Sequence, residues 1–163
     1  MEQNLSKKTR IESDLIGSRE VPESALYGVQ TLRGIENFRI SKFHLNEYPL
    51  FIQALAITKM GATVANRELD LLTEEQADAI LRACKEILEG KHHEQFPVDM
   101  IQGGAGTTTN MNANEVIANR ALELMGHQRE NINSVRLTIT STVRNLPTML
   151  ILQPSTLDCI ILI

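Results

Sequence analysis

The sequence contains no tryptophan, and aromatic residues make up only 4% of its 163 residues. Single-stranded nucleic acids bind largely by stacking their bases on aromatic rings, so this scarcity argues against that class of protein. The formal net charge of −4 also provides no electrostatic attraction to nucleic acid or to an anionic membrane surface. We therefore expect neither a nucleic acid nor a membrane among the partners of this chain.

Cysteine and long apolar runs are also scarce. Cys84 and Cys159 lie far apart, which suits neither a disulfide framework nor a zinc site. No apolar run reaches the length of a membrane span, and residues 1–10 lack the apolar core of a signal peptide. Hydrophobic residues at 42% and charged residues at 22% are typical of a soluble domain. The cytoplasm is therefore the expected location.

Helical periodicity dominates much of the sequence. The clearest helix is predicted over residues 73–88, where Thr73 and Gln76 have the spacing of a capping box and Gly90 follows as a C-terminal cap. Its apolar side chains form one stripe at helical spacing, made of Ala77, Ile80, Leu81, Cys84, Ile87 and Leu88. Because Cys84 lies on this stripe, we interpret it as a buried packing residue and not as a nucleophile.

The other segments indicate a mainly α fold. Residues 49–69 show the same periodicity and predict a second helix. Residues 11–38 mix charge, glycine and proline, which favours extended segments and turns with a short helix near 24–35. A further helix is predicted to begin at Asn114 as its N-cap and to end at Gly126.

Residues 102–115, the Gly/Thr/Asn stretch, combine glycine with a row of hydrogen-bonding side chains. They read Gln-Gly-Gly-Ala-Gly-Thr-Thr-Thr-Asn-Met-Asn-Ala-Asn-Glu. Glycine permits a close approach of the backbone to a ligand, and threonine hydroxyls with N–H groups before a helix can bind a small anion. A glycine turn followed by a helix with several capping residues explains the same pattern, because Thr and Asn favour caps for local reasons.

The sequence resembles the aspartase/fumarase superfamily of lyases, and within it the aspartases. The resemblance is collinear from Ile11 to Gln128 and rests on residues 20–22, 27–33, 35–38, 96–99, 102–115 and 119–127. It implies that residues 1–128 form the N-terminal lyase domain with the start of the central helical region. It also implies reversible deamination of L-aspartate to fumarate and ammonia, with a small dicarboxylate as ligand and a homotetramer as the assembly.

The resemblance assigns roles within the Gly/Thr/Asn stretch. Thr107, which follows Gly106, matches the substrate-binding threonine of the family's first signature, and Gly106 belongs to the same binding segment. Thr108 stands where aspartases usually have serine, a change that keeps the hydroxyl. Asn110 and Asn112 match positions that we expect to shape the loop and cap the following helix.

Neither a metal nor another cofactor is expected. Residues 92–94, His-His-Glu, lack the His-Glu-x-x-His spacing that puts two ligands on one helix face, so we interpret them as a solvated connector. His127 follows a helix-ending glycine and is interpreted as a capping or structural residue. Lys59 is expected to lie in solvent, while Arg19 and Arg33 can reach either a carboxylate ligand or a surface partner.

Two further superfamily signatures are missing, including the loop with the catalytic base serine, so we assign no catalytic residue and expect no turnover from this chain alone. Residues 129–163 contain no glycine and little charge. If one base is lost at or near the codon of Arg129, residues 143–153 can encode Ser-Gln-Ser-Thr-Asn-Asp-Ala-Tyr-Pro-Thr, which matches the missing second signature. We therefore predict that residues 129–163 are translated out of frame and form no domain.

Other interpretations stay open at this point. The chain can be a genuine short paralogue in which residues 135–143 form a strand and the Gly/Thr/Asn stretch binds a small anion or a protein partner without catalysis. It can also be part of a fumarase-type hydratase, although fumarases more usually have a Ser-Gly-Thr version of the stretch.

Overall fold

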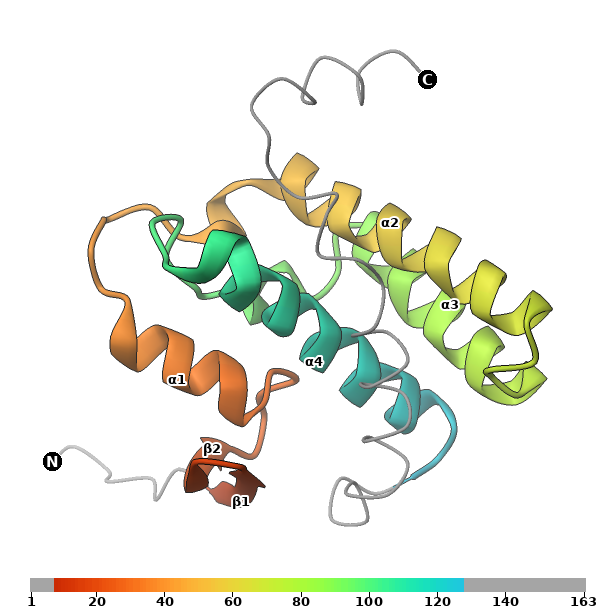
Figure 1. Cartoon of the computed structure of the whole chain (residues 1–163), viewed down its shortest axis with the longest axis horizontal. Coiled ribbons are helices and arrows are strands. Elements are labelled where there is room, and N and C mark those ends of the chain that lie inside the picture. The colour runs from red at the N-terminus through yellow and green to blue at the C-terminus, as the bar shows by residue number, and fades with distance from the viewer. Residues whose placement is uncertain (1–7, 128–163) are drawn as a thin grey trace, which may run out of the picture.

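Four α-helices and one β-hairpin make up residues 8–127, the part of the chain that the computed structural model describes (Figure 1). In chain order they are β1 (Thr9–Asp14), β2 (Gly17–Pro22), α1 (Val29–Asn37), α2 (Pro49–Glu68), α3 (Glu74–Leu88) and α4 (Thr107–Leu124). The connections contain three 3-10 turns, η1 (Leu45–Glu47), η2 (His93–Gln95) and η3 (Gly104–Gly106). The predicted mainly α fold is confirmed. The strand predicted over residues 135–143 lies outside the described residues.

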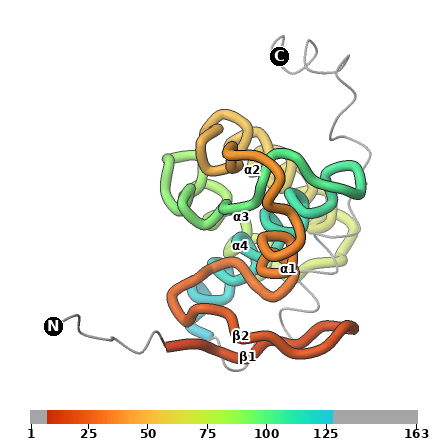
Figure 2. Tube along the Cα trace, turned by 90° about the vertical axis from the view of Figure 1, so that its left-hand side faces the viewer, coloured from red at the N-terminus to blue at the C-terminus, as the bar shows by residue number. Residues whose placement is uncertain are grey.

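The three longest helices form the main hydrophobic core. α2 packs along α3, and α4 lies between this pair and α1 (Figures 1 and 2). The fully buried apolar side chains of this core include Ile52, Ile80, Ile87, Val116, Ile117 and Leu122. Burying one such side chain contributes about 1.5–3 kcal/mol to the free energy of unfolding. None of the helices in residues 8–127 is long and apolar enough to cross a lipid bilayer.

The hairpin of β1 and β2 packs against α1, on the side away from α2 (Figure 2). The strands are antiparallel, and the Asp14 carboxylate closes their turn by accepting the N–H groups of Ile16 at 2.9 Å and Gly17 at 3.1 Å. The extended segments predicted here are confirmed. α1 begins later than the predicted Ser24, because backbone carbonyls of the preceding segment bind the Arg10 guanidinium and do not enter a helix.

Both ends of α3 agree with the prediction from the sequence. Thr73 Oγ1 accepts the N–H of Gln76 at 3.2 Å, and Gln76 Oε1 accepts the N–H of Thr73 at 3.1 Å. At the other end Gly90 has a φ of +86°, its N–H donates to the carbonyl of Ile87, and the next N–H donates to the carbonyl of Glu86. These two bonds form the Schellman motif that satisfies the last carbonyls of a helix.

The buried face of α3 is broader than the predicted stripe. Ala79 and Ala83 are buried as well, whereas Leu81 is only half-buried. The face widens because α3 packs against both α2 and α4. Cys84 has no exposed surface, and burial raises the pKa of its thiol to about 12, so its interpretation as a packing residue is confirmed.

The start of α4 corrects the prediction from the sequence. α4 begins at Thr107 after Gly106 as its N-cap, so the predicted N-cap at Asn114 is wrong, and Asn114 lies fully buried in the helix interior. Most of the Gly/Thr/Asn stretch is therefore helix, held by packing that overrides the local preferences of Thr and Asn. The predicted end is confirmed, because the N–H groups of Gly126 and His127 close the last turn.

The position of Lys59 on α2 also contradicts the prediction, although α2 itself matches the predicted helix. Lys59 is only 4% exposed, and its Nζ lies 2.6 Å from Oδ1 of Asn110 on α4. Lys59 lies on the face of α2 that meets α4, where the Asn110 amide oxygen accepts a hydrogen bond from its ammonium group. Burial lowers the pKa of Lys59 to about 8.

Candidate functional site

The chain enters α4 through three successive residues with positive φ. Gly104, Ala105 and Gly106 have φ values of +70°, +52° and +82°. The two glycines adopt this region without a steric penalty, whereas Ala105 bears a cost of about 1–2 kcal/mol. This left-handed turn reverses the chain and makes Thr107 the first residue of α4.

The three threonines of the stretch contact different neighbours. Thr107 is exposed, and its hydroxyl donates to the carbonyl of Gly104. Thr108 packs on α1 so closely that a Cβ added to Gly34 would lie 2.3 Å from Thr108 Cγ2. Thr109 is buried. The structure therefore does not gather the three hydroxyls into one anion cradle, and it leaves Thr107 as the exposed member.

Gln102 caps the first turn of α4, a role that the sequence analysis missed. Its Oε1 accepts the backbone N–H of Thr109 at 2.8 Å, and its Nε2 donates to the Thr109 hydroxyl at 2.7 Å and to the Asp99 carbonyl at 2.9 Å. The first N–H groups of a helix need acceptors from outside the helix, and this amide supplies one. No capping rule indicates Gln102, because it precedes Thr109 by seven residues.

The Asp99 carboxylate ties the base of the stretch to the segment after α1. It accepts the backbone N–H groups of Ile40, Ser41 and Ile101 and the Ser41 hydroxyl, at 2.7 to 2.9 Å. Burial by itself would raise the pKa of Asp99, but these four hydrogen bonds outweigh it and hold the pKa at about 2. The carboxylate therefore stays ionised, and it anchors the chain just before Gln102.

Asn110 and Asn112 hold α4 in place and do not cap it, which corrects the role expected from the sequence. Asn110 Oδ1 accepts from Lys59 on α2. Asn112 Nδ2 donates to the carbonyl of Gln95 in η2 at 2.9 Å. Both side chains are buried. They act as ties between α4 and its neighbours because the residues lie inside the helix, where no free N–H needs a cap.

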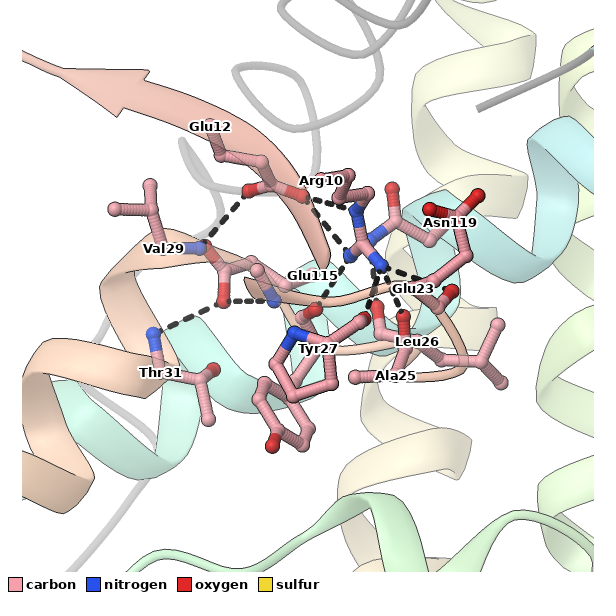
Figure 3. Close-up of polar contacts among 12 residues, drawn as sticks. Arg10, Glu12, Glu23, Ala25, Leu26, Tyr27, Val29, Thr31, Glu115 and Asn119 are labelled. Carbon is pink, nitrogen blue, oxygen red and sulfur yellow. Dashed lines mark hydrogen bonds and ion pairs between the residues drawn. The ribbon is translucent and has the colours of Figure 1, made fainter. Parts of the chain in front are cut away.

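The N-terminus of α1 is held by two carboxylates that the sequence analysis did not identify (Figure 3). Glu115 of α4 accepts the backbone N–H groups of Gly28, Gln30 and Thr31, and Glu12 of β1 accepts that of Val29. Both carboxylates are buried. The only available signal was an acidic residue inside an otherwise uncharged stretch, and it does not reveal which distant N–H groups the residue binds.

Arg19 and Arg33 bind carboxylates of this protein. Arg33 donates from Nε and Nη2 to the two oxygens of Asp14, at 2.8 and 2.9 Å. This hydrogen bonding lowers the pKa of Asp14. Arg19 lies 3.6 Å from Glu36, with both side chains largely exposed. Arg33 thus holds the turn of the hairpin, and Arg19 pairs with Glu36 at the surface.

The histidines after α3 contact that helix. His92 Nε2 lies 3.2 Å from Glu86 Oε2, and His93 Nε2 lies 2.8 Å from the carbonyl of Ile87. Both rings are half-buried, so the interpretation as a solvated connector is wrong for them, although Glu94 is exposed. Within residues 8–127, no three His, Cys, Asp or Glu side chains are grouped so that they could hold a metal ion.

Comparison with known proteins places this arrangement in one family. The family model described as lyase matches residues 17–148. The chain therefore belongs to this lyase family. Its relatives within the family include the aspartate ammonia-lyase of Pseudomonas aeruginosa, which is 58% identical over 121 residues. The aspartate ammonia-lyase of Escherichia coli is 53% identical over 126 residues.

These matches cover 74% and 77% of this chain but only 26% of each relative, so the chain spans about a quarter of their length. Among solved structures, fumarate lyase:delta crystallin from Brucella melitensis has a TM-score of 0.78 and 46% identity, over 85% of this chain and 32% of that chain. Class II fumarase from Schistosoma mansoni has a TM-score of 0.74 and 33% identity, over 82% of this chain and 28% of that chain.

Proposed function

We propose that the chain carries one corner of a site for a four-carbon dicarboxylate, and that the whole site catalyses reversible deamination of L-aspartate to fumarate and ammonia. The observation that carries this proposal is the exposed hydroxyl of Thr107 at the first residue of α4. The first turn of a helix favours an anion, because its N–H groups and its dipole point toward the ligand. The substrate follows from the names of the two bacterial relatives.

Each residue of the corner has a distinct part in this proposal. The Thr107 hydroxyl turns from the Gly104 carbonyl and donates to a substrate carboxylate. Gly106 is buried in this structure, and its positive φ shapes the turn from which Thr107 enters α4. Thr108 supports this turn from the face that packs on α1. Removal of a proton next to a carboxylate places extra charge on that carboxylate, and fixed donors stabilise this charge as it develops. Asn110 and Asn112 hold the helix that carries these donors.

The rest of the site is proposed to come from segments that this sequence does not contain. The family resemblance implies a base serine in a separate loop, supplied within a homotetramer, so no residue here is assigned the role of the base. We accordingly expect no turnover from this chain alone. The cytoplasm remains the predicted location.

A fumarase-type hydratase is the second candidate, favoured by the likeness to the Schistosoma mansoni fumarase. Both reactions act on fumarate, and they differ in whether ammonia or water is added. Identity to the two aspartate ammonia-lyases is higher, at 58% and 53% against 33% for the fumarase, so deamination is the first choice.

The test combines a binding measurement with a turnover measurement on the full chain. Fumarate is titrated into the isotope-labelled chain, and the amide NMR signals of residues 103–109 are followed. We expect saturable shifts there, and we expect Thr107→Val to weaken binding about 10- to 100-fold, because a hydrogen bond to a charged group is lost. Thr58→Val is the matched control, since Thr58 is an exposed helical threonine whose hydroxyl donates to the Ala54 carbonyl of its own helix.

The same preparation is assayed for conversion of L-aspartate to fumarate by ultraviolet absorbance. No conversion is expected. Fumarate production by this chain would refute the inactivity, and equal binding by the Thr107→Val and Thr58→Val variants would refute the assignment of Thr107.

A further inference from the structure

The N-terminus of α1 takes its hydrogen-bond acceptors from distant parts of the chain (Figure 3). The Glu115 carboxylate lies 2.8 Å from the N–H of Gly28 and 3.0 Å from those of Gln30 and Thr31. Glu12 accepts the remaining N–H, from Val29, at 2.9 Å. Helices usually satisfy these groups with a local cap or with water. Here a side chain of α4 takes that role, and it fixes where α1 begins relative to α4.

A second layer of contacts holds the segment that leads into α1. The Arg10 guanidinium binds Glu12 at 2.9 Å and the carbonyls of Ala25 and Tyr27 at 2.8 Å (Figure 3). Asn119, one helical turn after Glu115, donates to the carbonyl of Leu26 at 2.6 Å. The start of α1 is therefore fixed on α4 by two side chains of the same helix and cannot slide independently.

The other half of α1 lies against the candidate site. Gly34 faces the Thr108 methyl group with no room for a Cβ. Further along, the Phe38 ring lies 3.3 Å from where a Cβ of Gly103 would be. Thr108 lies two helical turns before Glu115, so both residues project from the same side of α4. α1 thus connects the Glu115 carboxylate at one end with the turn that carries Thr107 at the other.

We propose that Glu115 is a positioning residue of the dicarboxylate site, acting through α1 on Gly103 and Thr108. This inference rests on the proposed function. Loss of the carboxylate leaves three N–H groups at a buried helix end without their acceptor, and α1 can regain acceptors only by shifting. Because the contact between Gly34 and Thr108 leaves no free space, a shift of α1 moves the start of α4, where Thr107 lies.

The experiment compares Glu115→Gln with a matched control in the full chain. Glutamine has the size of glutamate and keeps one accepting oxygen, but its NH2 group is a donor, so at least one of the three N–H groups loses its acceptor and faces another donor. The control is Glu86→Gln, since Glu86 binds Arg120 at 2.6 and 2.9 Å and joins α3 to α4, and its hydrogen bonds within residues 8–127 reach Arg120 and His92 and no residue of α1. We expect both variants to lower the thermal midpoint. Only Glu115→Gln is expected to shift the Thr108 methyl and Gly103 amide signals and to weaken fumarate binding at least tenfold.

A second variant covers the case in which Glu115→Gln does not fold. Gly34→Ala leaves Glu115 in place and disturbs the contact of α1 with Thr108. It is therefore expected to shift the Thr108 and Gly103 signals and to weaken fumarate binding as Glu115→Gln does. Where all variants fold, we expect the variant with both Glu115→Gln and Gly34→Ala to bind fumarate no more weakly than the single variant with the weaker binding. The reason is that both substitutions act on the site through α1.

Two outcomes overturn the inference. One is a Glu115→Gln variant that is less stable but keeps wild-type Thr108 and Gly103 signals. The other is a Gly34→Ala variant that leaves the site signals unchanged. If the wild-type chain does not bind fumarate, the proposed function fails, but the signals of Thr108 and Gly103 still decide the positioning role of Glu115.

Discussion

At the residue scale, Lys59 combines an ammonium group with an almost fully buried position. Its Nζ binds the Asn110 amide oxygen. Within residues 8–127, the titratable group with an electrostatic effect on the pKa of Lys59 is the Cys84 thiol, which burial keeps protonated and therefore uncharged. A buried cation without a counter-charge lowers stability, and the lowered pKa of Lys59 is the measure of that cost. Because burial lowers the pKa of Lys59 and raises that of Cys84, the two groups make the stability of the fold depend on pH in opposite directions.

For Lys59, burial lowers the pKa from 10.5 to about 8. Between these values the unfolded chain holds more protons than the folded protein, so raising the pH from about 8 toward 10.5 stabilises the fold. Below about pH 8 both states are protonated and the folded protein bears the full cost, about 3 kcal/mol at most. For Cys84, the pKa rises from 9.0 to about 12, so stability falls with pH in that window.

We predict that the stability of Lys59→Met relative to wild type falls by about 1 kcal/mol between pH 7 and pH 9, because folded Lys59 is mostly neutral at pH 9 and no longer bears the cost of a buried charge. Urea unfolding at the two pH values measures this. Cys84 is common to both proteins and cancels in the difference. Lys85→Met, at an exposed position of α3, is the control and is expected to show no such change with pH. A stability difference between variant and wild type that is equal at both pH values would contradict the prediction.

At the element scale, helix ends in this chain are closed in two ways. α3 and α4 end in glycine at positive φ, Gly90 and Gly126, with bonds between residues five positions apart or closer. The starts of α1 and α4 instead depend on side chains from outside the helix, Glu115 and Gln102. The glycine ends are encoded by neighbouring residues, whereas the contacts of Glu115 and Gln102 with the helix starts form when the chain folds.

Gly90 and Gly61 offer a test of the local kind. A Cβ at either position meets no heavy atom of residues 8–127 within 4 Å, so the backbone conformation is what distinguishes the two positions. Gly90 has positive φ, and Gly90→Ala is expected to destabilise the protein by about 1 kcal/mol. Gly61 lies inside α2, where Gly61→Ala is expected to stabilise it by about 0.5–1 kcal/mol. Urea unfolding gives both values, and changes of the same sign would contradict this account.

At the scale of the whole molecule, residues 8–127 form one packed unit in which α4 contacts the other three helices. Several large apolar side chains are nevertheless exposed, among them Ile40, whose backbone N–H donates to Asp99, and Phe43, whose carbonyl accepts the N–H of Met100. The described part ends just after α4. The match to the lyase family model continues to residue 148. It therefore extends past Gln128, the residue after which the change of reading frame is predicted.

We predict that the nucleotide sequence carries a one-base loss at or near the codon of Arg129. Restoring the frame is expected to give Ser-Thr-Asn-Asp followed by Ala-Tyr-Pro-Thr within the codons of residues 143–153. Sequencing of the gene checks this directly. Codons that cannot encode the shifted signature would exclude the frameshift and favour a genuine short paralogue.

The fold was predictable where short-range bonds define it. The capping box of Thr73 and Gln76 and the end at Gly90 set α3 within its own few residues, and the structure agrees. The predicted N-cap at Asn114 was wrong because Thr and Asn favour caps on average, whereas here they lie inside a helix whose Asn110 and Asn112 amides bind α2 and η2. Thr107 was identified through the family resemblance, and its role remains a proposal.

The lyase family, the mainly α class and the ends of α3 were predictable from the sequence, because each of these depends on residue patterns along the chain. The packing of the helices, in contrast, buries Lys59 and leaves Thr107 as the exposed residue among the threonines at 107–109. It also decides that Glu115 binds N–H groups 84 to 87 residues away. Contacts over such separations form only when α1, α2 and α4 pack together, and no local pattern records which partner each side chain meets.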